Sequence, residues 1–277
     1  MRSLKFIPLG LVAAAGLAGV CVNPAQAHEP VFSVGPETIY AGGVGIESEF
    51  EIERGDDERL LAMHYEIIYG YTKDLSLTLS IPHIIGRKLE GNTSSGMGDI
   101  QFRGKYALFK RDYLGAQDKV TAIFGVKLPT GRDTAEPPLG SGAIDVMLGV
   151  SAGHESRTWY RFATLRYLAR NSSGGMSPGD RFMYDAAFGL RPKQSEYLEA
   201  DFVALLELNG EYEFAGKSDG IKQADSGGNT IWLGPSALWS KRNVMVKGGL
   251  QFPILQNLRG NQGGDDFRAV IAVEYHF

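Results

Sequence analysis

The residues best suited to chemistry in this sequence are carboxylates that recur at every second position near the start of the chain. They are Glu47, Glu49, Glu51 and Glu53, and the positions between them carry Ile46, Ser48, Phe50 and Ile52. Successive side chains of an extended strand point to opposite faces, so the four carboxylates share one face. Rows of carboxylates attract cations and are costly to place against lipid. The pattern therefore predicts a polar wall that attracts cations.

Charged residues also occupy the polar face of most later segments that alternate in this way. The acidic ones are Glu66, Asp99, Asp145, Asp185, Glu199, Asp201, Glu207 and Glu274. The basic ones are Arg103, Lys105, Lys127, Arg181, Lys247 and Arg268. Two interpretations remain open: a lattice of ion pairs that stiffens the fold, or a path that conducts or binds polar or cationic solutes. The two interpretations are compatible. In the conducting path, the four carboxylates Glu47, Glu49, Glu51 and Glu53 would form one wall and the basic residues the other.

Other motifs give little support to catalysis or to cofactor binding. A Gly-Ser-Gly sequence begins at Gly140, but it is not followed by Gly-Lys-Ser/Thr or by a helix, which argues against a nucleotide site. The five histidines lack the spacing of metal ligands, although His28 beside Glu29 could bind a metal weakly. His83 lacks a recognisable nucleophile, because Ser94 and Ser95 are ordinary loop serines. We therefore predict no enzyme activity, no cofactor and no specific metal site.

Strands must position these charges, because apolar and polar residues alternate with period two along most of the chain. Twelve such segments occur between Val44 and Phe277, and the loops after them alternate between long and short. The last segment has one apolar face, formed by Phe267, Ala269, Ile271, Val273, Tyr275 and Phe277. An apolar outer stripe with charges on the inner face is typical of a barrel in lipid. The sequence predicts an all-β, antiparallel, up-and-down transmembrane barrel of about 12 strands in a bacterial outer membrane.

Further expectations follow from this assignment. Aromatic residues near the short turns are expected to form an interfacial girdle of Tyr69, Tyr106, Trp159, Tyr160, Phe188, Tyr197, Trp239 and Tyr275. Residues 86–97 are expected to form a loop, while loops 129–142 and 209–229 form the outer vestibule. The facing of the strand at 158–170 stays open, because Arg161 and Arg166 fall on opposite faces. Twelve strands lie between filled barrels and wide porins, so we expect a narrow or plugged passage.

The N-terminal residues predict export. Arg2 and Lys5 precede an apolar run and the Ala25-Gln26-Ala27 sequence, which is the pattern of a secretory signal peptide over residues 1–27. Residues 28–43 are expected to be an irregular periplasmic leader, and residues 44–277 the barrel. Cleavage removes Cys21, the single cysteine, and leaves 26 basic against 32 acidic residues, a formal charge of −6 that does not favour nucleic-acid binding. Beyond the signal, no apolar run is long enough for a transmembrane helix.

Three short motifs resemble a known family. They are Gly96-Met97-Gly98-Asp99-Ile100, Lys127-Leu128-Pro129-Thr130-Gly131 and Gly140-Ser141-Gly142-Ala143-Ile144-Asp145. In this order, with the closing strand, the sequence resembles the outer-membrane proteins grouped as the MetA-pathway phenol-degradation family, often labelled "transporter". The resemblance covers most of the chain from about residue 43 and implies a barrel that passes aromatic or other hydrophobic compounds. It assigns no ligand residues beyond these glycines, Asp99 and Asp145.

These observations predict an outer-membrane channel or transporter for passive or facilitated passage of small molecules, which include aromatic or hydrophobic compounds if the family resemblance extends to the solute. The alternative is a non-conducting structural or adhesion barrel whose loops bind a partner. The expected partners are outer-membrane lipids, the barrel-assembly machinery and a small-molecule solute, with no nucleic acid. The expected location is the outer membrane of a Gram-negative bacterium.

Overall fold

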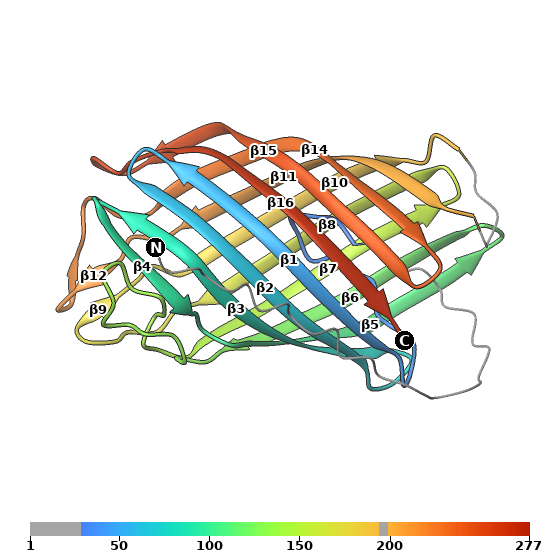
Figure 1. Ribbon diagram of the computed structural model, residues 1–277, viewed down its shortest axis with the longest axis horizontal. Coiled ribbons are helices and arrows are strands. Elements are labelled where there is room, and N and C mark those ends of the chain that lie inside the picture. Colours follow the sequence, from blue (N-terminus) through green and yellow to red (C-terminus); the bar gives the residue numbers. More distant parts are fainter. Residues whose placement is uncertain (1–28, 194–198) are drawn as a thin grey trace, which may run out of the picture.

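Twelve long antiparallel strands form a closed barrel in the computed structural model, which describes residues 29–193 and 199–277 (Figure 1). The strands are β1 (Val44–Gly55), β2 (Glu58–Gly70), β3 (Leu75–Leu89), β5 (Gln101–Tyr113), β6 (Ala116–Lys127), β7 (Asp145–Ser156), β8 (Trp159–Ala169), β10 (Arg181–Leu190), β11 (Asp201–Glu213), β14 (Gly228–Lys241), β15 (Val244–Leu258) and β16 (Asp265–His276). β1 pairs with both β2 and β16, which closes the sheet and leaves no free edge. The predicted fold is confirmed. The predicted signal peptide lies outside the described residues.

Four short strands lie outside this count. β4 (Asn92–Met97) pairs with the end of β3, and β9 (Met176–Ser177), β12 (Lys217–Ser218) and β13 (Ile221–Lys222) form a small separate sheet. The expectation of a simple loop over residues 86–97 is therefore wrong. Pairing continues there through backbone hydrogen bonds although the polar and apolar residues no longer alternate, and a register shift between Ile84 and Arg87 marks the change.

The two faces of the barrel differ as the alternation predicts. Large apolar side chains such as Leu148 (62% exposed) and Ile271 (55% exposed) cover the outer face, whereas Thr121, Ser151 and Glu207 on the inner face have no exposed surface. This separation suits a barrel with lipid outside and polar groups inside. No helix in the described part of the chain is long and apolar enough to cross a membrane.

The model assigns the facing of β8, which the sequence left open. Trp159, Arg161 and Leu165 are exposed on the outer face, and Tyr160 and Thr164 are buried inside. The two arginines of the strand therefore point to opposite sides, with Arg161 outside and Arg166 inside. The placement of Tyr160 in the aromatic girdle is wrong, because its ring belongs to an inner apolar cluster. Tyr197 lies outside the described residues.

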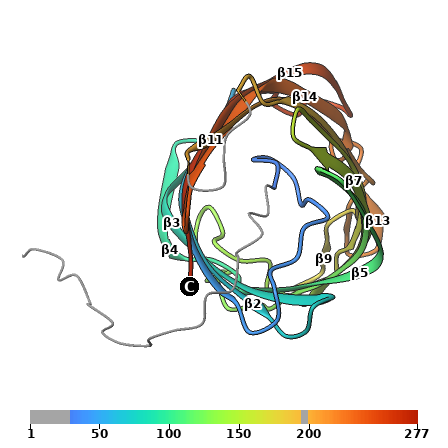
Figure 2. The ribbon, with the colours of Figure 1, turned by 90° about the vertical axis from the view of Figure 1, so that its right-hand side faces the viewer.

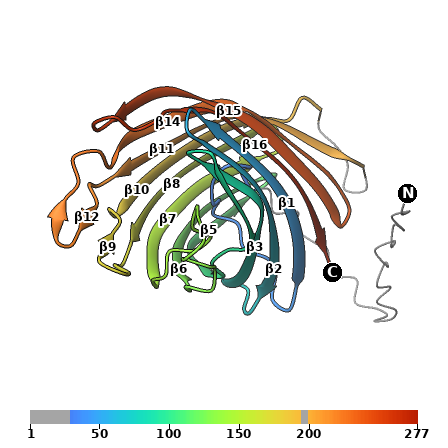
Figure 3. The same cartoon turned by 60° about the vertical axis from the view of Figure 1, so that its left-hand side comes forward.

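Long loops gather at one end of the barrel, called here the loop end, with the small sheet of β9, β12 and β13 (Figures 1 and 3). Tight turns over residues 71–74, 114–115, 157–158 and 242–243 and the C-terminus mark the opposite turn end. Two connections depart from the expected alternation: residues 56–57 make a short turn at the loop end, and residues 191–200 make a longer connection at the turn end.

Residues 29–43, called here the inner segment, contain no strand and lie inside the barrel (Figure 2). The segment joins β1 at the turn end, where the Gly42 amide donates to the Gly70 carbonyl at 2.7 Å and the Tyr40 hydroxyl donates to the carbonyl of Phe277. Val31 packs into an inward apolar cluster with Tyr160 and Phe162 of β8 and neighbouring strands. The lumen is therefore partly filled by the chain itself.

Candidate functional site

Glu207 of β11 holds the start of the inner segment by its backbone. Its two carboxylate oxygens accept the amide hydrogens of Val31 at 2.9 Å and Phe32 at 3.0 Å, and the Ser236 hydroxyl donates to the first. Glu207 has no exposed surface, and no Lys or Arg of the described residues pairs with it. Hydrogen bonds to a charged acceptor are roughly twice as strong as neutral ones, so these donors can replace a counter-ion. Glu207 therefore acts as an anchor for the inner segment.

The rest of the inner segment follows the inner wall from strand to strand. The Thr164 hydroxyl of β8 donates to the Val34 carbonyl at 2.9 Å, and the Thr121 hydroxyl of β6 donates to the Pro36 carbonyl at 2.6 Å. The Ile39 amide then donates to the Ser76 hydroxyl of β3 at 2.9 Å. A segment without regular structure needs such partners, because buried backbone groups left unpaired are costly. The segment thus lines the wall as a partial ring, placed by small hydroxyl side chains.

Two ion pairs add to these backbone contacts. Glu29 pairs with Lys105 of β5, and Glu37 pairs with Lys119 of β6 at 3.2 Å. Both lysines are buried. Loss of the partner would leave a buried lysine charge uncompensated, which is strongly destabilising. Each ion pair therefore favours the position of the inner segment against the barrel wall.

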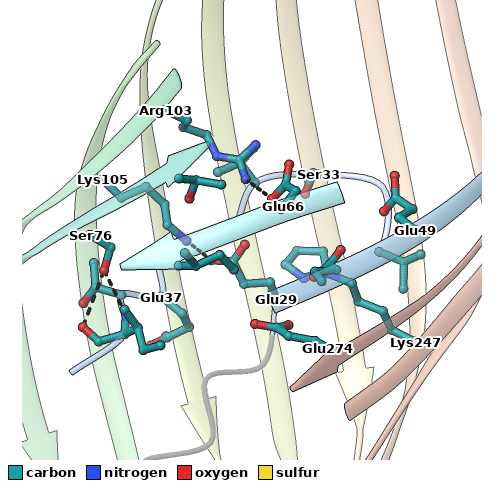
Figure 4. Close-up of a pocket in the computed structure, with 18 of the residues that line it drawn as sticks. Glu29, Ser33, Glu37, Glu49, Glu66, Ser76, Arg103, Lys105, Lys247 and Glu274 are labelled. Atoms are coloured by element: carbon teal, nitrogen blue, oxygen red, sulfur yellow. Dashed lines mark hydrogen bonds and ion pairs between the residues drawn. The ribbon is translucent and has the colours of Figure 1, made fainter. Parts of the chain in front are cut away.

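A cavity of about 200 Å³ lies between the inner segment and the barrel wall, where residues of β1, β2, β3, β5, β15 and β16 line it (Figure 4). Ion pairs connect Glu47 with Lys247 at 2.8 Å and Glu66 with Arg103 at 3.0 Å, and His276 Nε2 lies at hydrogen-bond distance, 2.5 Å, from Glu274 Oε1. Glu49 also lines this central cavity, and no residue of the described chain pairs with it. The central cavity is therefore polar, and Glu49 is its carboxylate without a fixed partner.

The lumen charges do not divide into an acidic and a basic wall, so that part of the hypothesis is wrong. Lys247 lies beside Glu47, and His64 lies 2.9 Å from Glu51 on the next strand. Opposite charges mix on neighbouring strands because a buried charge is costly unless it is paired or hydrogen-bonded. Other predicted residues in such pairs are Arg103, Lys105, Lys127, Asp145, Arg181, Asp185 with the unassigned Arg166, and Asp201 with Arg191.

Glu199 is placed differently from the other predicted residues. It precedes β11, is exposed, and lies 3.3 Å from Lys193 in the connection at the turn end. The alternation of its neighbours suggested that the strand began earlier than Asp201. Glu199 is therefore outside the strand that was expected to carry it into the lumen.

The three family-like motifs meet at the loop end in one structure, called here the loop clamp. Lys127 Nζ lies 3.7 Å from Asp99 and 2.5 Å from Asp145. The Asp99 carboxylate accepts the backbone amides of Gly131 at 2.9 Å and Ser141 at 2.7 Å. These contacts fix both ends of the loop between β6 and β7. Asp99 and Asp145 are buried, and their contacts within the clamp account for them without a role in conduction.

Close packing explains the glycine in the third motif. A Cβ atom on Gly140 would lie 2.5 Å from Asp99 Oδ1 and 2.7 Å from the Gly131 carbonyl oxygen, which is closer than real side chains approach. The missing side chain of Gly140 therefore leaves room for the Asp99 carboxylate.

Several lumen residues were missed by sequence reasoning. The Arg268 guanidinium lies over two aromatic rings, and its carbon is 5.2 Å from the ring centre of Phe32 and 4.4 Å from that of Trp232. Nε and Nη2 of Arg268 donate to Gln251 Oε1 at 2.9 and 2.6 Å. Trp232 could have been assigned to the inner face from its position in the alternation. Phe32 lies in the irregular segment, where no period indicates a direction.

The fold and the inward charges define a transmembrane barrel of the outer-membrane type, with a polar, partly filled lumen. More particularly, the chain belongs to the family described as "Putative MetA-pathway of phenol degradation", whose model matches residues 27–252. The resemblance stated from the motifs is confirmed.

Solved structures show the same fold at low sequence identity. An outer membrane channel from Pseudomonas putida F1 superposes with a TM-score of 0.74 at 13% identity, over 91% of this chain and 100% of that one. The NanC porin superposes with a TM-score of 0.50 at 10% identity, over 83% of this chain and 98% of that one. Both are described as a channel or a porin rather than as enzymes. No curated protein matches the chain.

Proposed function

We propose that this protein is an outer-membrane channel for small polar solutes, in which the inner segment narrows the passage. The observation that carries the proposal is the partial ring of residues 29–43 along the inner wall, which leaves a polar cavity of about 200 Å³ beside it. A barrel built only as a scaffold needs no such cavity. The names of the structural neighbours, a channel and a porin, support the same function.

The charges favour cations among the polar solutes. Glu49 in the central cavity and Glu53 nearer the loop end have no partner among the described residues, whereas every predicted lumen lysine and arginine except Arg268 has a carboxylate partner. A free carboxylate in a narrow passage attracts cations more than one already neutralised. The phenol in the family's description fits this lumen less well than a charged solute does.

The test measures ion selectivity in planar bilayers under a salt gradient. Glu49→Gln with Glu53→Gln is expected to move the reversal potential away from cation preference. A matched control, Glu199→Gln, changes an exposed carboxylate at the turn end and is expected to leave the potential unchanged. Equal reversal potentials for the parent protein and the double variant would contradict the proposed preference.

The second candidate is a barrel that does not conduct. The density of contacts on the inner segment favours it, because Glu207 and three hydroxyl groups hold the segment in the lumen. Absence of conductance in a correctly folded protein, with and without the segment, would support this candidate.

The proposal includes export by cleavage after Ala27 and insertion into the outer membrane of a Gram-negative bacterium by the barrel-assembly machinery. The apolar outer face of the barrel supports contact with membrane lipids. N-terminal sequencing of the protein purified from outer membranes would test the cleavage site.

A further inference from the structure

A second cavity of about 330 Å³ lies at the loop end of the lumen. Its walls combine carboxylates with apolar surface from Trp232, Leu258 and Phe267. Cavities that hold small molecules begin at about 300 Å³, and they typically combine apolar walls with a few polar groups. The loop-end cavity therefore has the size and composition for a small organic molecule.

Carboxylates outnumber basic groups in the lining of this cavity, where Arg181 and Arg268 are the basic residues. Glu58 is paired with Arg87 at 2.6 Å, and Glu211 and Glu213 are paired with Arg181 at 3.0 and 2.8 Å. Two other lining carboxylates, Glu53 and Asp265, have no ion-pair partner among the described residues. They come from neighbouring strands, β1 and β16, at the same end of the barrel. Two unpaired carboxylates in one cavity repel each other, and a cation bound between them would relieve this repulsion.

The basic side chain opposite Glu53 also lines this cavity, but it lies outside ion-pair distance of Glu53. Arg268 is its direct cross-strand partner in the β1–β16 register, which ordinarily favours an opposite-charge pair. Its guanidinium instead donates to Gln251 and lies over the rings of Phe32 and Trp232. Glu53 is thus left without an ion-pair partner among the described residues, although Arg268 stays on the wall of the same cavity.

We propose that the loop-end cavity binds a small organic cation with an ammonium or guanidinium head and a short apolar body. The head group lies between Glu53 and Asp265, and the body lies against the Trp232, Leu258 and Phe267 walls. Arg268 lines this cavity and lies over the ring of Phe32, which lines the central cavity. A solute bound here therefore occupies the boundary between the two cavities. This inference rests on the proposed channel function, because it names the class of solute.

Tryptophan fluorescence tests the site without requiring conduction. The chain has three tryptophans, and Trp159 and Trp239 lie on the outer face. In a Trp159→Phe, Trp239→Phe background, Trp232 alone reports on the cavity. Titration of the refolded barrel in detergent with n-butylammonium is expected to give a saturable change in emission, and titration with butyrate is expected to give none.

Variants separate this site from a general charge effect. Glu53→Gln with Asp265→Asn is expected to weaken n-butylammonium binding by about tenfold or more, whereas Glu49→Gln, in the central cavity, is expected to leave it within about twofold. Heat-modifiable mobility on gels verifies folding, and Glu53→Gln alone replaces the double variant if the latter does not fold. The absence of a saturable change, an equal response to butyrate, or equal affinity in the Glu53 variants would overturn the proposal. Saturable binding in a barrel that never conducts would refute the channel function and retain the site.

Discussion

Replacement of Glu207 by Gln is expected to release the inner segment from the lumen wall. The amide keeps the size of the side chain but offers one acceptor oxygen, whereas the carboxylate now accepts both the Val31 and Phe32 amides. A hydrogen bond to a charged group contributes about 1.5–3 kcal/mol and a neutral one about 0.5–1.5 kcal/mol. Loss of one bond and weakening of the other therefore reduces the holding energy by about 2–5 kcal/mol. The released population should rise roughly 30- to 4,000-fold.

Cysteine labelling measures that population. Val34 is 7% exposed and lies where the Thr164 hydroxyl holds the segment, so a Val34→Cys side chain reacts with a maleimide only when the segment leaves the wall. A chain beginning at residue 28 contains no other cysteine. When reclosing is fast, the labelling rate follows the population of the released state. The rate is expected to increase at least tenfold in the Glu207→Gln background, in line with the energies above.

Glu211→Gln is the matched control, because this carboxylate lies on the same face of β11 but pairs with Arg181 in the loop-end cavity. It is expected to leave the labelling rate of the Val34→Cys protein unchanged. Equal labelling rates in the Glu207→Gln and parent backgrounds would refute the assignment of Glu207 as the anchor.

Three further changes test other parts of the structure. Gly140→Ala should destabilise the loop clamp and speed proteolysis of the loop between β6 and β7, because the new Cβ would clash with the Asp99 carboxylate. Gly86→Ala, where a Cβ meets open space, should be cleaved as slowly as the parent, and equal cleavage of the two variants would contradict the clash. Lys247→Met leaves Glu47 buried without its cation, so the free energy of unfolding in urea should fall by about 3–5 kcal/mol, and an unchanged midpoint would argue against the pair. Leu148→Arg puts a charge on the outer face and should lower the free energy of unfolding by about 2–4 kcal/mol if the position lies near the bilayer centre. Folding into lipid vesicles measures this change, and equal stability of variant and parent would contradict the lipid-facing assignment.

The alternation of residue types accounts for what could be predicted from the sequence. In β16, for example, Ile271 and Val273 are exposed outside while Ala272 and Glu274 are buried inside, as a period of two requires. The same rule left β8 open, because its two arginines occupy both faces. An arginine on the outer face next to Trp159 is close to the turn end, where the side chain can reach the polar interface, so charge alone did not indicate the direction.

The contacts inside the lumen could not be predicted in the same way. Glu207 was expected to point inward, but its partners are backbone amides of an irregular segment more than 170 positions earlier in the chain. Such partners leave no side-chain pattern, because any residue other than proline can supply an amide. The loop clamp shows the intermediate case: its three motifs were recognised separately, and only the closed sheet brings Asp99, Lys127 and Asp145 together.

The most direct test of the account is the single-channel conductance of the refolded protein in a planar bilayer, with and without residues 28–43. The account predicts small, cation-preferring steps for the intact chain and larger steps once the segment is removed, because the partial ring no longer narrows the lumen. No steps in either form, with heat-modifiable mobility retained as evidence of a folded barrel, would contradict the claim that this protein is a channel.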